Sequence, residues 1–228
     1  MYRTKTVAVV VPCLNEAENI SNTIAGIPAF VDRIIVVDDG SSDRTSEEAK
    51  TCKRDTIILR NERPTGVGGA IIAGHKRALA EGADMVAVMA GDGQMPPEFL
   101  PLFADAIASG YDYAKGNRFM RQGDLKGMSL LRIIGDGYMS VLIRLATGLS
   151  VFDSHNGYTM ISASALRKID FDAIERGFFF ENSMLFALAK MGARVVDIPC
   201  SIRASAKSNV NEIMLLADLP GFFLRRMS

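Results

Sequence analysis

Residues 34–50 read IIVVDDGSSDRTSEEAK, and this stretch decides the fold class. It opens with four β-branched residues, and a short apolar run bounded by turn residues is typical of a buried strand. Two acids, a glycine and two serines follow at once, which predicts a turn. Asp43 then precedes a segment of helix formers, as a helix-capping residue does. A buried strand that leads through a polar turn into a helix is half of a βαβ unit.

The same alternation of apolar runs and helix-period segments continues through the first half of the chain. It predicts an α/β fold with a single, mostly parallel sheet flanked by helices. Strands are expected near residues 6–12, 33–38, 56–60, 84–90 and 111–117, and helices near 16–27, 43–53, 67–81 and 97–109. An amphipathic segment at 128–147, a strand at 157–162, a helix near 181–191 and a strand near 194–199 are expected to complete the sheet.

Composition and charge narrow the classes of function. The 228 residues are 48% apolar, enough for the core of one domain, and 26 basic residues balance 26 acidic ones. A net charge of zero gives no support to a nucleic-acid partner. The three cysteines match neither a zinc site nor a redox pair, so we expect reduced thiols in a cytosolic protein. The two histidines, His75 and His155, are too far apart in the sequence to suggest a histidine metal site.

The sequence also bears on membrane contact. No run of 18 apolar residues occurs, so no spanning helix is expected. Residues 209–228 form an amphipathic C-terminal segment, with FFLRR at 222–226, which lies either on an anionic membrane surface or against the body of the protein. We therefore expect a cytoplasmic protein that is either free in the cytosol or bound peripherally at the cytosolic face of the membrane.

Polar residues follow the expected strands at their carboxyl ends, where open parallel sheets bind ligands. They are Glu16, Asp38, Asp39, Asp92, Gln94 and Arg118. The first turn, PCLNEAEN, lacks the glycines of a dinucleotide fingerprint, and no Gly-Lys dipeptide supplies an ATPase phosphate loop. A nucleoside diphosphate with Mg²⁺ or Mn²⁺ accounts for the acids better. Asp39 would then bind the base or ribose, and Asp92 and Gln94 would supply oxygen ligands to the cation.

Consecutive motifs resemble those of family 2 glycosyltransferases. They are VPCLNEAENI at 11–20, IIVVDDGSSDRT at 34–45, GVGGAIIAGHKRALAEGAD at 66–84, MAGDGQMPPEFL at 89–100 and GNRF at 116–119. The resemblance extends over about residues 6–208 and is strongest to the branch of dolichol-phosphate mannose synthases and polyprenyl-phosphate sugar transferases. It implies a GT-A fold, with a Rossmann-like sheet, over residues 1–208.

The resemblance also implies roles for individual residues. Nucleotide contacts would come from Pro12, Leu14, Glu16, Asp39 and Gly68, cation and diphosphate contacts from Asp92 and Gln94, and acceptor or diphosphate contacts from Arg118, Arg132, Arg203, Lys207 and Ser208. Asp153 and Glu181 are candidate bases for a hydroxyl acceptor. Two positions depart from the family pattern: Ala90 replaces the first acid of an Asp-x-Asp motif, and Thr159 replaces an arginine.

The activity implied is inverting transfer of a sugar from a nucleoside-diphosphate sugar to a polyprenyl phosphate. A lipid phosphate is already ionised at neutral pH, whereas a hydroxyl acceptor would need a base. Transfer to a hydroxyl and a non-catalytic relative that only binds the nucleotide sugar stay open as alternatives. A nucleotidyltransferase is a weaker alternative, because the expected glycine-rich basic first loop is missing. Phe178, Phe179 and Phe180 hint at an apolar acceptor channel.

Simple structural roles are also open at several of these positions. Asp43 is expected to cap a helix, and Asp38 to support its own loop. Glu16 would serve equally as a capping acid at the first helix. Asp92 lies between two glycines, and of these residues it is the least easily explained by a structural role.

Overall fold

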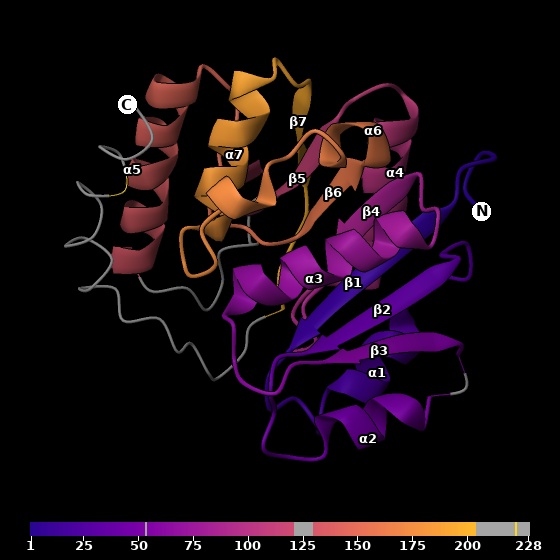
Figure 1. The fold of residues 1–228 in the computed structure, drawn as a ribbon. Helices are drawn as coiled ribbons and strands as arrows, with labels where there is room; N and C mark the ends of the chain where they lie inside the picture. Colours follow the sequence, from indigo (N-terminus) through magenta and orange to yellow (C-terminus); the bar gives the residue numbers. More distant parts are fainter. Residues whose placement is uncertain (53, 121–129, 204–221, 223–228) are drawn as a thin grey trace.

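A seven-stranded sheet in the order β3-β2-β1-β4-β6-β5-β7 forms the centre of the computed structural model, which describes residues 1–52, 54–120, 130–203 and 222 (Figure 1). The strands are β1 Val7–Cys13, β2 Arg33–Asp38, β3 Thr56–Arg60, β4 Met85–Val88, β5 Tyr113–Asn117, β6 Thr159–Ser162 and β7 Val195–Pro199. All pairings are parallel except those of β6, which is antiparallel to both β4 and β5. The expected single, mostly parallel sheet is confirmed.

Helices cover both faces of the sheet (Figure 1). They are α1 Ile20–Gly26, α2 Thr45–Lys50, α3 Val67–Ala80, α4 Leu100–Ala108, α5 Leu130–Thr147, α6 Ala163–Leu166 and α7 Phe180–Lys190, with short 3₁₀ turns η1 Pro97–Phe99, η2 Arg118–Met120 and η3 Phe171–Ala173. One apolar cluster joins the sheet to α3 and α7, and the other joins it to α1 and α4. Strand β1 is buried along its whole length, because it lies between these two layers.

The structure shifts some of the expected boundaries. The first helix begins at Ile20 rather than near residue 16, because Asn15 has a left-handed φ of 56° and keeps the chain in a loop. Gly82, with a φ of 75°, follows α3 as a helix-ending glycine does. Strand β6 lies between β4 and β5, so the ends of β4 and β5 are not neighbours. The carboxyl ends of β4 and β5 nevertheless lie at the same edge of the sheet, because β6 is antiparallel to both strands.

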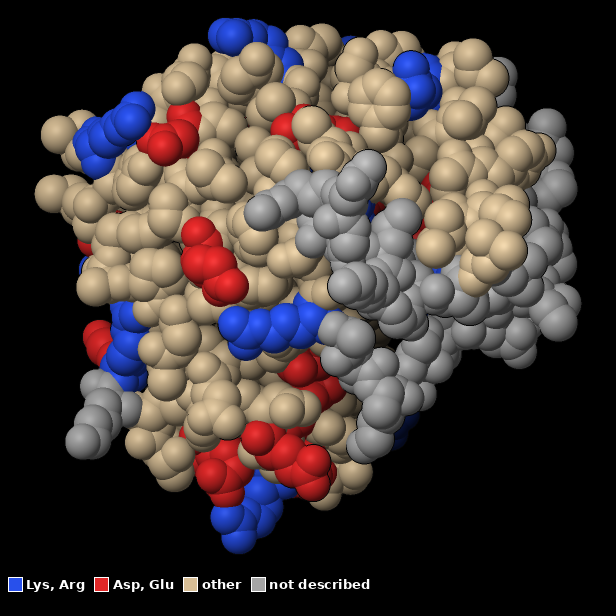
Figure 2. All heavy atoms as spheres, turned by 180° about the vertical axis from the view of Figure 1, so that it is seen from behind, with Lys and Arg blue, Asp and Glu red and all other residues tan. Residues whose placement is uncertain are grey.

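The surface and the C-terminal segment add three observations. Acidic and basic side chains are interspersed over the face in Figure 2, in keeping with the zero net charge. Of the expected amphipathic segment 209–228, only Phe222 is described, and it stacks on Phe179 in the core. Within the described residues, none of the helices is both long enough and apolar enough to cross a membrane. The three cysteines are free thiols.

Candidate active site

The loop after β2 is held by its own acids. Asp38 is fully buried, and it accepts hydrogen bonds from the Ser41 amide (2.8 Å) and the Ser46 hydroxyl. Burial alone would raise the pKa of Asp38, but the two serine contacts lower it below the ordinary value. Asp43 accepts from the Thr45 amide at the start of α2 (2.9 Å). These contacts agree with the supporting role expected for Asp38, whereas the N-cap residue of α2 is Arg44 and Asp43, expected to cap this helix, holds the turn just before it.

Asp39 is also buried, and it binds the loop that leads into α3. One carboxylate oxygen, Oδ1, accepts from Asn61 Nδ2 (2.7 Å) and the Thr65 hydroxyl (2.8 Å), and the other accepts from the Gly66 amide (2.9 Å). Asp39 therefore joins the β2 and β3 ends. A contact from this carboxylate to a base or ribose stays a prediction. For that contact, one Asp39 oxygen must accept a hydrogen bond from the nucleotide in addition to the bonds that it accepts already.

The end of β1 presents the other expected nucleotide contacts. Pro12 is buried within the strand, whereas the Leu14 side chain is exposed. The Glu16 carboxylate accepts from Asn19 Nδ2 (2.8 Å), and the Glu16 amide donates to the Thr45 hydroxyl (2.8 Å). Glu16 thus lies at the same sheet edge as Asp39, and its carboxylate contacts Asn19, the N-cap residue of α1. Both of its expected roles stay open.

Gly68 has a packing reason to be glycine. A Cβ placed there would lie 2.7 Å from the Phe180 ring, 2.8 Å from the Glu175 carbonyl oxygen and 2.9 Å from Arg176 Cα. The Gly68 amide also donates to the Arg176 carbonyl (2.9 Å). The glycine therefore allows the start of α3 to lie against residues 175–180. A nucleotide contact at Gly68 stays a prediction.

Asp92 lies in a tight turn after β4. Its two oxygens accept from the Gln94 amide (2.9 Å) and from Gln94 Nε2 (2.8 Å). A Cβ added at Gly91 would lie only 2.8 Å from Cys13 Cβ, and Gly93 has a φ of 72°. Both positions therefore require glycine. Burial raises the pKa of Asp92, which the Gln94 amide only partly offsets.

Asp92 faces an open hollow of 320 Å³ between α1 and the turn after β4. The hollow is lined by Asn19, Asn22, Thr23, Gly26, Met89, Asp92, Gly93, Met95, Pro97 and Arg203. Arg203 closes one side, since its amide donates to the Gln94 carbonyl (2.8 Å) and its guanidinium lies 3.7 Å from Glu98. The structure therefore brings Arg203 beside Asp92 and Gln94. Lys207 and Ser208 lie outside the described residues.

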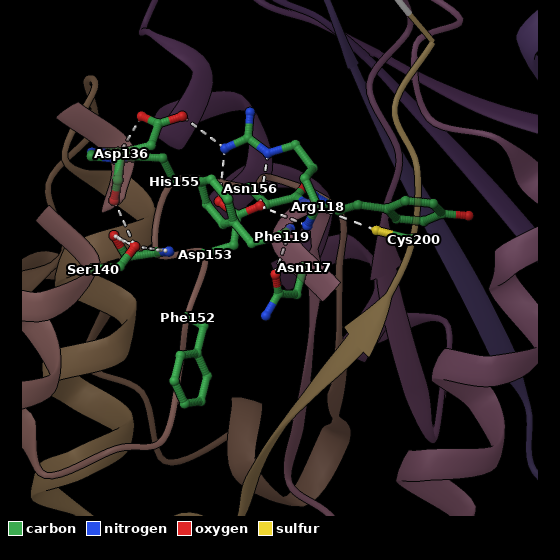
Figure 3. Close-up of polar contacts among 12 residues, drawn as sticks. Asn117, Arg118, Phe119, Asp136, Ser140, Phe152, Asp153, His155, Asn156 and Cys200 are labelled. Atoms are coloured by element: carbon green, nitrogen blue, oxygen red, sulfur yellow. Dashed lines mark hydrogen bonds and ion pairs between the residues drawn. The ribbon is translucent and has the colours of Figure 1, made fainter. Parts of the chain in front are cut away.

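Arg118 follows β5 and forms a second polar group, shown in Figure 3. Its Nε and one terminal nitrogen donate to the two oxygens of Asp153, both at 2.7 Å, and that terminal nitrogen also donates to Asp136 (2.9 Å). The Arg118 amide donates to Asp153 as well (3.0 Å). Arg118 and Asp153 are both buried. A forked pair of this kind fixes the direction of the guanidinium.

Asp136 extends this group to two further helices. Its carboxylate lies 3.3 Å from His155 Nδ1, and His155 Nε2 lies 3.1 Å from Asn182 Nδ2 on α7. Burial alone would raise the pKa of Asp136, but the His155 hydrogen bond and the charge of Arg118 lower it. Arg132, one turn earlier on α5, lies 4.0 Å from Asp136.

Glu181 belongs to a third, deeper group. Its Oε2 accepts from Lys115 Nζ (3.0 Å) and from the Tyr113 hydroxyl (3.1 Å), and Lys115 also donates to the Asn156 carbonyl (2.5 Å). Lys115 is fully buried, and Glu181 nearly so. Burial and the charge of Glu181 raise the pKa of Tyr113 well above its ordinary value. Glu181 Oε1 has no hydrogen-bond partner among the described residues.

Comparisons with known proteins identify the family. The model of "Glycosyl transferase family 2" matches residues 8–170 of the chain. The chain belongs to this family. It is similar to the undecaprenyl-phosphate mannosyltransferase of Micrococcus luteus, with 33% identity over 199 residues that cover 85% of this chain and 82% of that protein. It is 27% identical to the polyprenol monophosphomannose synthase of Mycolicibacterium smegmatis over 225 residues, or 92% and 85% of the two chains.

Solved structures place this glycosyltransferase in the GT-A fold. The glucosyl-3-phosphoglycerate synthase of Mycobacterium tuberculosis in complex with phosphoglyceric acid has a TM-score of 0.77 and 20% identity, over 98% of this chain and 80% of that one. The complex of the same enzyme with Mn²⁺, uridine diphosphate and phosphoglyceric acid has a TM-score of 0.73 and 20% identity, over 99% and 79%. The expected family and the expected fold are both confirmed.

Sequence reasoning missed part of the glycosyltransferase's polar interior. Asp136, His155, Asn182 and Lys115 all join the expected site residues Arg118 and Glu181. A signal for Asp136 was present, because it is the only acid in the helical segment 130–147 and lies four residues after Arg132. Lys115 carried another signal, as a lysine inside an expected buried strand. Neither signal shows which residue Asp136 or Lys115 contacts in the folded protein.

Proposed function

We propose that this family 2 glycosyltransferase moves a sugar from a nucleoside-diphosphate sugar to the phosphate of a polyprenyl phosphate, with inversion at the anomeric carbon. The names of the M. luteus and M. smegmatis relatives support a polyprenyl acceptor. Asp153 is paired with Arg118, and Glu181 with Lys115. These two ion pairs are the observation that favours a phosphate acceptor over a hydroxyl acceptor.

Both candidate bases contact a cation, Asp153 through both of its oxygens and Glu181 through Oε2 alone. Asp153 receives three hydrogen bonds from Arg118, and Glu181 receives its bonds from Lys115 and Tyr113. A carboxylate that is held in this way is a poor general base, because protonation would break its ion pair. An acceptor hydroxyl needs such a base, whereas a phosphate oxygen carries its charge already. The arrangement therefore favours a phosphate acceptor.

The two arginines of the acceptor side have different exposure. The Arg132 side chain is 36% exposed, against 5% for Arg118. We assign the direct contact with the acceptor phosphate to Arg132. Arg118 would then hold the Asp136 carboxylate in place and add positive charge to the acceptor site without touching the phosphate. The sugar would move as the phosphate oxygen attacks the anomeric carbon and the nucleoside diphosphate leaves, with Arg203, Lys207 and Ser208 around the leaving group.

The donor side is assigned to the loops after β1, β2 and β4. Among the described residues, no group of three or more His, Cys, Asp or Glu side chains could hold a metal ion by itself. Asp92 with Gln94 nevertheless fits Mg²⁺ or Mn²⁺, since Mg²⁺ binds through one or two carboxylates together with substrate phosphates and water. The cation would neutralise charge on the departing diphosphate. Ala90 supplies no second carboxylate, so the diphosphate itself would complete the site.

Transfer assays with matched acceptors test the proposal. The purified chain is incubated with nucleotide sugars carrying guanine, uracil or thymine and with a short-chain polyprenyl phosphate or the corresponding polyprenol. We expect product only with the phosphate. Product with the polyprenol would favour the hydroxyl alternative, and calorimetric binding of a diphosphate without any transfer would favour the non-catalytic one.

A variant pair tests the acceptor contact. Arg132→Gln is expected to raise KM for the phosphate acceptor about tenfold, the size of one lost charged hydrogen bond. Arg167→Gln changes an exposed arginine outside the site and is expected to leave KM unchanged. Equal KM values for the two variants would remove Arg132 from the acceptor site.

A further inference from the structure

Helix α5 carries a row of exposed apolar side chains, here named the α5 stripe. Its members are Leu130, Ile134, Tyr138, Val141 and Leu145, with exposed fractions between 49% and 79%. Their spacing of four, four, three and four residues places them within an arc of about 80° on the helix. The stripe is about 22 Å long, at 1.5 Å per residue. Large apolar side chains gathered in this way on a surface mark a contact site.

The opposite side of α5 belongs to the core and to the candidate site. Met139 and Ile143 are buried, and the helix packs against α7. Asp136, the only acid in the helix, points to this inner side, where it contacts Arg118 and His155. The exposed large apolar side chains that the structure describes on α5 therefore share one face, and this face carries no acidic residue of α5.

A cation lies beside the stripe. The exposed Arg144 stacks on Phe152, with its guanidinium carbon 4.1 Å from the ring centroid, and Phe152 is itself 47% exposed. A hollow of 260 Å³ at this end of the helix is lined by Val141, Arg144, Leu145, Gly148, Leu149 and Ser150. An arginine beside apolar and aromatic side chains matches the boundary between lipid headgroups and acyl chains.

We propose that the α5 stripe docks on an anionic lipid bilayer, with Arg144 at the headgroup phosphates. This choice of occupant rests on the proposed function, because a polyprenyl phosphate resides in a bilayer. Helix α5 joins the two tasks, since its outer face carries the stripe, while on its inner side Asp136 contacts Arg118 and Arg132 lies 4.0 Å from Asp136. The docked helix would hold the acceptor site at the level where the lipid phosphate lies.

The dimensions of the stripe favour a bilayer over a second copy of the chain. A strip about 22 Å long and 10 Å wide covers on the order of 220 Å². Stable protein interfaces bury roughly 800 Å² on each partner. A bilayer has no such requirement, because affinity grows with the inserted apolar area and with each nearby cation.

Vesicle sedimentation tests the proposal with the full chain. The probes are vesicles of phosphatidylcholine and vesicles of phosphatidylcholine with phosphatidylglycerol. The wild type is expected to bind the anionic vesicles more tightly. The double variant I134E/L145E, which changes only exposed positions, is expected to bind them at least about tenfold more weakly, because two inserted apolar side chains become charged. The control is Leu102→Glu, an exposed leucine on α4, which is expected to bind like the wild type.

Two results of vesicle binding and one of size-exclusion chromatography would count against the docking surface. Wild-type protein that fails to bind anionic vesicles, or a double variant that binds them equally well, would overturn it. A wild-type dimer that becomes a monomer in the double variant, by size-exclusion chromatography, would assign the stripe to self-association instead. Transfer to a short-chain acceptor in detergent is measured on the same proteins. Stripe-dependent vesicle binding without any transfer would refute the proposed function and leave the docking surface standing.

Discussion

Replacing Asp153 by asparagine is the most direct test of the buried group around Arg118. The substitution preserves the size of the side chain and removes its charge. Asp153 receives two hydrogen bonds from the Arg118 guanidinium and one from the Arg118 amide, and both residues are buried. The variant would leave the buried guanidinium 2.9 Å from the Asp136 carboxylate and without the Asp153 charge.

The expected cost follows from this geometry. Removing one member of a buried ion pair destabilises a protein by about 3–5 kcal/mol. Asp136 still compensates part of the Arg118 charge, so we expect a cost near the lower limit, about 3 kcal/mol. For a chain of this length, 1 kcal/mol shifts Tm by about 2–4 °C, which gives a decrease of roughly 6–12 °C. Urea unfolding followed by circular dichroism measures the free energy, and a thermal scan measures Tm.

The matched control is Asp172→Asn, which makes the same chemical change at an exposed position on η3. It is expected to change the free energy of unfolding by no more than about 0.5 kcal/mol. A loss below about 1 kcal/mol in Asp153→Asn would refute the reasoning, because the pair would then behave like a surface ion pair.

Four further substitutions have defined outcomes. Asp92→Asn should abolish sugar transfer while the urea unfolding curve stays unchanged; full activity would remove Asp92 from the donor site. Burial lowers the pKa of His75 to about 3, so the unfolded chain alone binds this proton between about pH 6.5 and 3 and stability falls as the pH falls. Between pH 6.5 and pH 5, the free energy of unfolding of His75→Leu should therefore decrease by about 2 kcal/mol less than that of the wild type. Urea titrations at the two pH values measure this decrease, and equal decreases in the two proteins would contradict the reasoning. Gly68→Ala should lower the free energy of unfolding by about 1–3 kcal/mol, because the added Cβ would be too close to its neighbours. Gly135→Ala on α5, with open space around it, should raise that free energy by up to about 1 kcal/mol. Equal unfolding midpoints of the two variants would contradict the packing at Gly68.

The order of strands and helices could be predicted from local patterns. Strands such as Val7–Cys13 are continuous apolar runs, because both of their faces are covered, and glycines such as Gly82 mark helix ends by their backbone freedom. The place of β6 could not be predicted in this way. A four-residue strand carries no mark of its neighbours, and insertion between β4 and β5 is decided by hydrogen bonds between distant segments.

The sequence by itself determined the α/β class, the family and the positions of the polar strand ends, since each depends on residue types at short and regular spacing. Only the tertiary structure decided which charges meet. Asp153 and Glu181 have the chemistry of bases, yet the fold places Arg118 and Lys115 against them. It also turns Asp136 inward and the α5 stripe outward. The physical reason is that a buried charge must find a partner within a few ångströms, and that partner is supplied by folding from positions far away in the chain.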